Sequence, residues 1–552
     1  MLSGLRTCLC IVLLSAFAFP QGIWERKAPF PISATEVSAA ALDGKLYVVC
    51  GLQSGSASNR LFIYDPRLDV WSEGAPLPVP GGADHCNVAA VNGKLYVLGG
   101  LGISDGATFE YDSIANRWQQ VATMPLARGA SGVAAIGSRI YVAGGLAGGS
   151  SVANFDVFET STKQWTSLPN MPTARDHLTA QVVNGKFYAI AGRAGREFNV
   201  NEEYDPGTNA WLARAQIPTA RGGLGSGALN NRIQVFGGEG ASGTPEGTFQ
   251  QNEEYDPATN LWRALTPMRV PRHGLYGATL EGRIFAPSGG PRAGGNFSNE
   301  HDAFYLPPSE PPRISGVRHS ASLDGTAALA PGTLVSLFGE RFSFGEQVAS
   351  RFPLASQMNA VVVKVDGMAV PLIYASPGQV NFLLPYSLDP RPISITVTNA
   401  GSESVAANAT LAIDAPGIYT IDQSGQRQGA ILIAGTGLLA SDTREGFALT
   451  RPARRGEAIE IYATGLGAVT NPPPGGEAAR SDPLSRTIQQ VVVTIGGARA
   501  EVLFSGLTPG FTGLYQVNAR VSQSAPVGDD VPVLLRMGET GPPSNTVTMA
   551  VE

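Results

Sequence analysis

The sequence has little charge, and this shortage narrows the classes of protein it can belong to. Charged residues make up 15% of the 552 residues, and acidic residues exceed basic ones by 45 to 39, so the formal net charge is −6. A chain without a basic excess is not expected to bind nucleic acid. With 67 Gly and 40 Pro beside so few charges, we expect an all-β protein of many short strands and turns.

Long hydrophobic runs are also missing, except at the very start of the chain. Arg6 precedes the apolar segment from Cys8 to Phe19, in which Ala16 and Ala18 form an A-x-A-like cleavage site. Because twelve residues are too few for a membrane-spanning helix, we expect residues 1–21 to be a signal peptide. The mature chain is then secreted, to the periplasm, cell surface or medium, and has no membrane span.

Cysteine is scarce as well. Of the four cysteines, Cys8 and Cys10 leave with the signal peptide, and Cys50 and Cys86 remain. An oxidising compartment permits a disulfide between them, but the sequence leaves open whether they lie within bonding range. Cys50 occupies a position where other repeats carry Gly, so a small buried residue is equally compatible.

What the sequence does contain is a repeat that uses every tryptophan. Successive tryptophans are 47, 47, 47, 46 and 51 residues apart, and seven residues before each of the last five stands an aromatic residue followed by an acid, as in Tyr111-Asp112. Each unit also has a two-residue turn such as Asn92-Gly93 and a short strand that ends in glycine, as in Leu95 to Gly100. We therefore expect four strands per unit and a β-propeller. The tryptophans are Trp24, Trp71, Trp118, Trp165, Trp211 and Trp262.

The two ends of the repeat region complement one another. The first unit offers only a strand around Trp24, whereas the last, Leu280 to Tyr305, has the earlier strands and lacks a following Trp. We expect the N-terminal strand to complete the last blade, which gives a closed ring of six blades over residues 22–305. Five features recur in the same order in these units: a turn, Gly-Gly, Tyr-Asp, Trp and a following Met-Pro, as at Met124-Pro125. This series resembles kelch repeats.

A second, fainter repeat follows a Pro-rich linker at residues 306–313. PGTLVSLFGERF at 331–342 is echoed by RGEAIEIYATGLG at 455–467, VVVKVDG at 361–367 by VVVTIGG at 491–497, and Gln-Val-Asn at 379–381 by the same triplet at 516–518. These β-branched runs predict two Ig-like β-sandwiches, at 314–415 and 416–552. This half resembles the Solibacter-type C-terminal domain of secreted acidobacterial proteins and, more loosely, IPT/TIG domains, a resemblance that implies export and no activity.

Candidate ligand-binding residues follow from the blade register. Ten residues after a Trp stands an arginine at the start of an inner strand, and these four arginines are expected to ring one mouth of the propeller. The register resembles that of kelch propellers whose arginines hold acidic peptides, and guanidinium groups pair well with carboxylates, so an acidic protein or anionic glycan is the expected partner. The alternative is that each arginine bonds groups of its own scaffold. The four are Arg128, Arg175, Arg221 and Arg272.

Further candidates lie near the same mouth. Arg193 belongs to a Gly/Ser-rich loop that borders it, and His85, His177 and His273 fall near inner strands. The histidines stand 14, 12 and 11 residues after a Trp, so they are not in one register, and no metal site is predicted. His177, His273 and Arg193 join the four arginines as predicted ligand-binding residues.

Catalytic signatures are missing. There is no G-x-S-x-G elbow, phosphate-binding loop or metalloprotease histidine pair, and no copper-radical ligand set like that of galactose oxidase, so no catalytic residue or cofactor is predicted. A binding function is favoured. A carbohydrate-active kelch enzyme resembling a sialic-acid mutarotase remains the alternative, because acid/base chemistry leaves little motif. The ligand's identity and the oligomeric state stay open.

Overall fold

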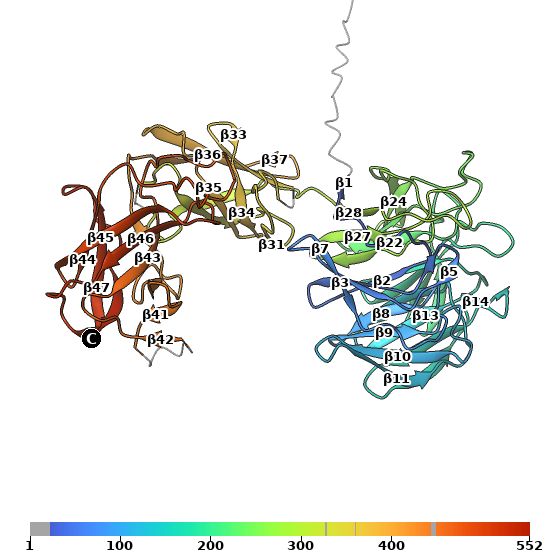
Figure 1. The fold of residues 1–552 in the computed structure, drawn as a ribbon. Helices are drawn as coiled ribbons and strands as arrows, with labels where there is room; N and C mark the ends of the chain where they lie inside the picture. Colours follow the sequence, from blue (N-terminus) through green and yellow to red (C-terminus); the bar gives the residue numbers. More distant parts are fainter. Residues whose placement is uncertain (1–21, 326–327, 359, 443–448) are drawn as a thin grey trace, which may run out of the picture. The chain divides into compact units, whose positions relative to one another are not determined.

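The structure is a computed structural model that describes residues 22–325, 328–358, 360–442 and 449–552 (Figure 1). The predicted signal peptide, residues 1–21, lies outside the described residues. Every regular element in the described ranges is a strand, which confirms the all-β prediction. Among these residues, no helix offers the length and apolarity needed to cross a membrane.

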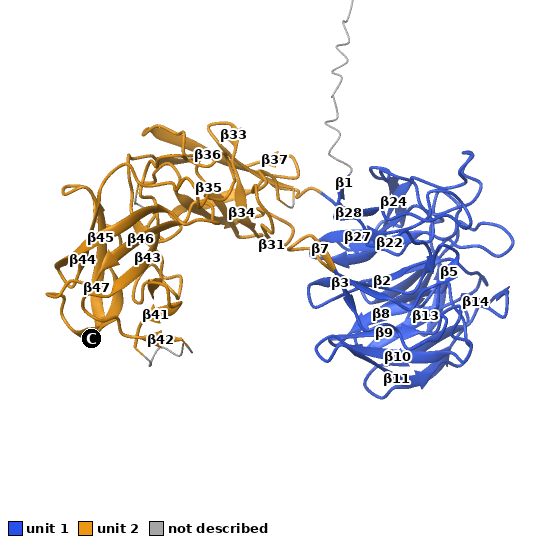
Figure 2. Cartoon of the chain, in the orientation of Figure 1, with its two compact units in different colours: residues 1–63, 72–306 blue, residues 64–71, 307–552 orange. Residues whose placement is uncertain are grey.

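The chain divides into two compact units, which Figure 2 colours separately. The first comprises the described residues up to 63 together with 72–306, and the second comprises 64–71 and 307–552. The Pro-rich residues 306–312 are all described and form no strand. The chain passes from the first unit to the second between Leu306 and Pro307, at the start of this stretch.

Four-stranded sheets make up the first unit, and the part of it that the structure describes contains six of them. Their innermost strands contact one another in a closed circle, the arrangement of a β-propeller. In chain order the sheets are β2 (Ser38–Leu42), β3 (Lys45–Val49), β6 (Leu61–Asp65) and β7 (Val70–Gly74); β8 (Val88–Val91), β9 (Lys94–Leu98), β10 (Ala107–Asp112) and β11 (Arg117–Thr123); β12 (Gly132–Ile136), β13 (Arg139–Ala143), β16 (Phe155–Glu159) and β17 (Gln164–Leu168); β18 (Thr179–Val183), β19 (Lys186–Ile190), β20 (Asn201–Asp205) and β21 (Ala210–Ala213); β22 (Gly225–Leu229), β23 (Arg232–Phe236), β24 (Asn252–Asp256) and β25 (Leu261–Ala264); and β26 (Ala278–Leu280), β27 (Arg283–Pro287), β28 (His301–Tyr305) and β1 (Ile23–Arg26).

The last of these sheets joins the two ends of the unit. Strand β1 pairs antiparallel with β28, and Trp24 lies opposite Phe304 with the ring centroids 5.0 Å apart. The Trp24 indole N–H donates to the carbonyl of Thr266 at 3.0 Å. The N-terminal strand thus supplies the outer strand that the last repeat lacks.

The repeated tryptophan and tyrosine hold neighbouring sheets together. Within a sheet the two rings lie opposite each other on adjacent strands, as Tyr111 and Trp118 do with centroids 4.9 Å apart. The indole N–H of Trp118 donates to the Ala75 carbonyl of the preceding sheet at 2.8 Å, and that of Trp262 donates to Ala215 at 2.7 Å. These two indoles thus combine partial burial with a hydrogen bond between blades.

A disulfide also crosses from one sheet to the next. Cys50 follows β3 and Cys86 precedes β8, and the structure joins their sulfur atoms. Two short hairpins extend other loops of this unit: β4 (Leu52–Gln53) with β5 (Ser56–Ala57), and β14 (Leu146–Ala147) with β15 (Ser150–Ser151). The pairing that the sequence left open is therefore present, immediately after His85.

The second unit contains two apolar cores that follow the second sequence repeat. One core lies among residues 329–411 and the other among residues 418–551. The echoed segments form equivalent pairs, because β30 (Leu334–Glu340) pairs with β35 (Gln379–Leu383) and β43 (Ala458–Thr464) pairs with β46 (Tyr515–Arg520). The strands of the first half are β29 (Arg313–His319), β30 (Leu334–Glu340), β31 (Gln347–Val348), β32 (Val361–Val365), β33 (Met368–Ala369), β34 (Leu372–Ala375), β35 (Gln379–Leu383), β36 (Pro392–Asn399), β37 (Ser402–Glu403) and β38 (Ala407–Thr410).

The two halves of this unit differ in how their sheets are joined. The first has separate sheets on either side of its core, whereas the strands described in the second form one continuous sheet, in which the ten-residue strand β45 pairs with both β44 and β46. The strands of the second half are β39 (Gly417–Ile418), β40 (Ile431–Ile433), β41 (Leu438–Ala440), β42 (Thr450–Arg451), β43 (Ala458–Thr464), β44 (Val491–Ile495), β45 (Ala498–Leu507), β46 (Tyr515–Arg520), β47 (Gly528–Met537) and β48 (Val547–Val551).

One buried histidine lies where these halves meet. His319, at the end of β29, has a relative exposure of 1%, and a side chain at Gly417 or Gly465 would collide with its ring. The backbone amides of Ala321 and Ser322 donate to Nδ1 at 3.3 and 3.4 Å, so the ring is held in its neutral form. Burial lowers the pKa of His319 to about 4.

We predict that the second unit loses stability as the pH falls from 6.5 to 4. The unfolded chain takes up a proton at His319 near pH 6.5, before the folded chain does, so the free energy of unfolding drops by about 3 kcal/mol across this window. The measurement is calorimetry of the full chain. Five of the six tryptophans lie in the first unit, and Trp71, in segment 64–71, belongs to strand β7 of one of the four-stranded sheets. The transition without a tryptophan fluorescence change therefore belongs to residues 307–552. A pH slope that is unchanged in His319→Gln would contradict this assignment.

Candidate functional site

The four arginines predicted to ring the propeller mouth are buried inside the sheets. Arg128, Arg175, Arg221 and Arg272, hereafter the register arginines, have relative exposures of 0 to 1%. Buried guanidinium groups cannot reach a ligand at the mouth without rearrangement of the blade. The structure therefore corrects the expectation that these side chains hold an anionic ligand, and it agrees with the alternative in which they bond their own scaffold.

Arg175 illustrates what the register arginines do instead. Its Nε donates to the Ala191 carbonyl at 2.8 Å, and its two terminal nitrogens donate to Ala189 at 3.0 Å and Thr173 at 2.8 Å. One of those nitrogens also lies 2.6 Å from the carboxylate of Glu202, itself buried. The guanidinium thereby neutralises a buried acid and satisfies carbonyls where the strand ends. The acids facing the other three are Asp156, Glu253 and Asp302.

Two residues after each register arginine the chain turns through a left-handed conformation. The equivalent residue of each sheet, hereafter the ring position, has φ between 49° and 64°. The amide of each ring residue from His85 to Gly274 donates to the carbonyl of the ring residue before it, at 2.8 to 3.3 Å. A chain of hydrogen bonds thus passes from sheet to sheet around the centre. The ring residues are Glu36, His85, Ala130, His177, Gly223 and Gly274.

A residue other than glycine at the ring position carries a conformational cost. Glycine adopts the left-handed conformation freely, and two sheets use it, but other residues pay about 1–2 kcal/mol to do so. Glu36, His85 and His177 nevertheless occupy the position, and strained residues of this kind cluster at functional sites. These three residues, hereafter the channel cluster, are the strongest candidate site in the kelch-like half of the chain.

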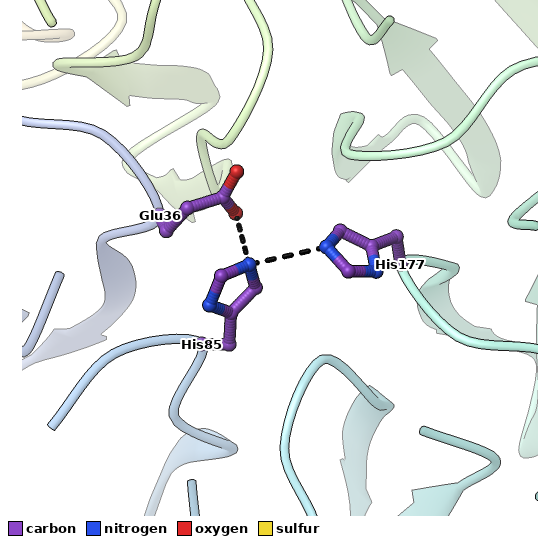
Figure 3. A group of neighbouring side chains, drawn as sticks. All are labelled: Glu36, His85 and His177. Atoms are coloured by element: carbon purple, nitrogen blue, oxygen red, sulfur yellow. Dashed lines mark hydrogen bonds and ion pairs between the residues drawn. The ribbon is translucent and has the colours of Figure 1, made fainter. Parts of the chain in front are cut away.

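Figure 3 shows how the three side chains of the channel cluster converge. His85 Nε2 lies 3.0 Å from Glu36 Oε2 and 3.1 Å from His177 Nε2. The side chains are 8 to 12% exposed. They line a cavity of about 10 Å³, which holds one water-sized particle. The rest of its wall is largely apolar, with Leu178, Leu224 and Leu275 among the lining residues.

A second layer of charged groups surrounds the channel cluster. The residue before each histidine is an aspartate: Asp84 Oδ1 lies 2.5 Å from His85 Nδ1, and Asp176 Oδ1 lies 2.5 Å from His177 Nδ1. Each carboxylate therefore fixes the ring of the neighbouring imidazole and leaves its Nε2 facing the centre. The contact of one imidazole with another is thus set by the second layer.

Two mouth loops add further charges. Arg193 donates to His177 Nε2 at 2.9 Å and lies 2.5 Å from a carboxylate oxygen of Glu239. The buried His273 has its Nδ1 at 3.4 Å from Glu36 and 3.5 Å from Glu239. Loop and ring residues therefore form one network at the centre of the propeller.

The network shifts the protonation of its members. Burial opposes protonation of His85, but the charges of Glu36 and Asp84 outweigh it and raise the pKa of His85 to about 10. Burial also opposes ionisation of Glu36, yet the positive charge of His85 and a hydrogen bond from His273 hold the pKa of Glu36 well below its usual value. Burial opposes protonation of His273 as well, but the carboxylates of Glu36 and Glu239 outweigh it and raise the pKa of His273. At neutral pH the centre is an imidazolium–carboxylate network.

The structure brings together some of the predicted residues and adds others. His177, His273 and Arg193 lie in the network, whereas the register arginines do not. Glu36, His85 and Glu239 complete it, and none of these was predicted as a site residue. Counting from tryptophan placed the histidines in different registers because the segment after Trp71 is longer. The missed signal was the Asp-His dipeptide, which recurs at 84–85 and 176–177 in equivalent positions.

The mouth loops start beside the ring. The residue before each ring position bridges to the first part of the second-to-third-strand loop of the same sheet, as Asp176 does with Arg193 and Gly222 with Glu239. This pairing explains why loop side chains reach the channel cluster. The other bridges are Thr35 with Leu52, Asp84 with Leu101, Gly129 with Leu146, and His273 with Gly290.

Comparison with known proteins identifies the repeat. The kelch motif matches residues 34–78, 84–125, 127–172 and 174–213. The first unit therefore contains kelch repeats. Among similar proteins, the kelch-like protein terF of Aspergillus terreus is 30% identical over 302 residues, covering 52% of this chain and 56% of that protein. Human kelch-like protein 38 is 26% identical over 252 residues, covering 44% and 42%.

A further relative and a solved structure are also similar to this chain. Alpha-scruin of Limulus polyphemus is 30% identical over 193 residues, 33% of this chain and 21% of that protein. A solved structure described as that of YjhT is 19% identical, covers 50% of this chain and 95% of its own, and has a TM-score of 0.43. The chain spans about half the length of the two kelch-like relatives named above. The kelch motif itself falls within the first unit.

We predict that Arg175→Met lowers the free energy of unfolding of the kelch unit by about 3–5 kcal/mol, because it leaves the Glu202 carboxylate buried without a partner. The double variant Arg175→Met/Glu202→Met should recover most of this loss. Urea unfolding followed by tryptophan fluorescence measures both, and Arg117→Met, on the exposed part of β11, is the control. A loss of less than about 1 kcal/mol in the single variant would refute the structural role.

Proposed function

We propose that the protein is exported and that its kelch unit binds an acidic segment of a protein partner at the loop-lined mouth of a six-bladed propeller. The observation that carries this proposal is the set of loops bonded to the ring, all of which start from the same edge of their sheets. Their tips, such as 54–56, 148–150 and 292–295, are exposed and rich in Gly and Ser. Loops on a rigid scaffold are where recognition usually resides.

The preference for an acidic partner now depends on fewer cations than the sequence suggested. The register arginines are neutralised inside the sheets, and Arg193 is paired with Glu239. Arg196 and Arg292 remain as exposed cations on the mouth loops. Both are able to contact a carboxylate of a bound partner without leaving a buried acid behind.

Export is supported by the disulfide between Cys50 and Cys86, because such bonds persist in oxidising compartments. It is also consistent with the charged-then-apolar order of residues 1–21. The Ig-like character proposed for the second unit, and its Solibacter-type resemblance, fit a role in surface display.

We predict that the mature protein binds poly-glutamate peptides, and that Arg196→Ser/Arg292→Ser weakens this binding at least about 10-fold through loss of two charge-assisted contacts. Binding should also weaken from 50 to 300 mM salt. Fluorescence anisotropy of labelled peptides measures both effects, with Arg117→Ser as the control for loss of a positive charge outside these loops. An acidic-glycan array is run in parallel: binding to glycans alone would replace the protein partner by a glycan, and binding to neither probe would overturn the proposal.

One observation favours a second function, that of a carbohydrate-active enzyme resembling a sialic-acid mutarotase. The channel network holds imidazole and carboxylate groups with shifted pKa values, which suits acid/base chemistry. If this function holds, the protein accelerates anomer exchange of sialic acid in NMR, and Arg193→Met, which alters the network at the mouth side, slows it. Exchange no faster than in buffer would eliminate this candidate.

A further inference from the structure

We propose that the channel cluster is a binding site for a divalent transition-metal ion, for which Zn²⁺ is the probe, with Glu36, His85 and His177 as the protein ligands. The proposal goes beyond partner binding at the loops and does not depend on it. Two imidazole nitrogens and one carboxylate oxygen form a common ligand set for zinc and for other ions of this class. Counting residues from tryptophan predicts no metal site, because it places these histidines out of register.

The ligand atoms already have the spacing of a metal site. The two Nε2 atoms are 3.1 Å apart, Glu36 Oε2 is 3.0 Å from His85 Nε2, and one ligand atom from each residue lies within 4.8 Å of the others. Two nitrogens at tetrahedral positions around zinc are about 3.3 Å apart, given bonds of about 2.0–2.1 Å. A small shift of side chains therefore makes room for the ion, and no change of backbone is required.

Both imidazoles are oriented as metal ligands usually are. Asp84 and Asp176 take up the Nδ1 side of His85 and His177, so each Nε2 faces the centre. A carboxylate on the far nitrogen of a metal-binding histidine fixes the ring and makes it a better donor. An Asp-His dipeptide occurs in each of two sheets that are not neighbours in the circle. The two imidazoles therefore approach the centre from different sides, as ligands of one central ion would.

The size and charge of the centre also fit an ion better than an organic ligand. The cavity of about 10 Å³ admits a single water-sized particle. Four carboxylates, those of Glu36, Asp84, Asp176 and Glu239, lie around the two imidazoles of the cluster, together with the guanidinium of Arg193 and the imidazole of His273. A metal ion would displace the proton on His85 and supply positive charge beside these carboxylates in its place.

Arg193 occupies part of the site in the structure. Its terminal nitrogen donates to His177 Nε2 at 2.9 Å. This hydrogen bond uses the nitrogen lone pair that would bind a metal ion. The side chain is about a third exposed, and its other terminal nitrogen is held by Glu239. Arg193 can therefore release His177 and keep its partner in the loop. This competition predicts that removing Arg193 strengthens metal binding.

The ring position supplies matched variants for a test. His85→Gly and His177→Gly remove a ligand and retain a residue that adopts the left-handed conformation, as Gly223 and Gly274 do in the same ring. Ala130→Gly makes the same backbone change at a ring position that carries no ligand. Tryptophan fluorescence checks that each variant keeps the folded kelch unit.

Titration of the untagged mature protein with Zn²⁺ by calorimetry is expected to show one equivalent bound. His85→Gly and His177→Gly should weaken binding at least 100-fold, Asp84→Asn by about 10- to 100-fold, and Ala130→Gly not at all. Arg193→Met should strengthen it. Co²⁺ substitution should give visible absorption that the two histidine variants lose. The absence of saturable binding, or binding that the histidine variants retain, would overturn the proposal and leave peptide binding by the loops unaffected.

Discussion

The backbone hydrogen bonds that join one sheet to the next at the ring position are the constraint on which the rest of the kelch unit depends. Each bond requires a left-handed residue, so the ring fixes where the first side-chain atom of that residue points. Glycine meets the requirement without cost. Placing Glu36, His85 and His177 there costs conformational energy, and the result is three polar side chains directed at one point.

The groups that stabilise the strained ring residues lie deeper in the sheets. The register arginines satisfy carbonyls and buried acids two residues before the ring, and the tryptophans bond each sheet to its neighbour. The disulfide adds a covalent link beside His85. Because packed sheets resist deformation, a strained residue at the centre persists where a flexible loop would relax. Stability and site geometry are therefore supplied by different residues of the same segment, Arg175 and His177 being one example.

Sequence periodicity predicted the repeat, its strands and its strand order well, because tryptophan, tyrosine and glycine perform the same packing task in every unit. The kelch motif and the closure of the last sheet by the strand around Trp24 both follow from it. The same periodicity misassigned the register arginines, since a position repeated in four units is more often structural than functional. It also missed His85, because offsets counted from tryptophan include segments of unequal length, and only the backbone ring shows that residues 85 and 177 are equivalent.

Anomalous diffraction tests directly whether the strained ring residues form a metal site. Crystals of the untagged mature protein are grown with Zn²⁺, and data are recorded on both sides of the zinc absorption edge. If the channel cluster binds zinc, one anomalous peak is expected at the centre of the ring, about 2.0–2.2 Å from the ligand atoms of Glu36, His85 and His177. The ring hydrogen bonds should be intact. Diffraction that shows the ring intact and no peak between these side chains would contradict it.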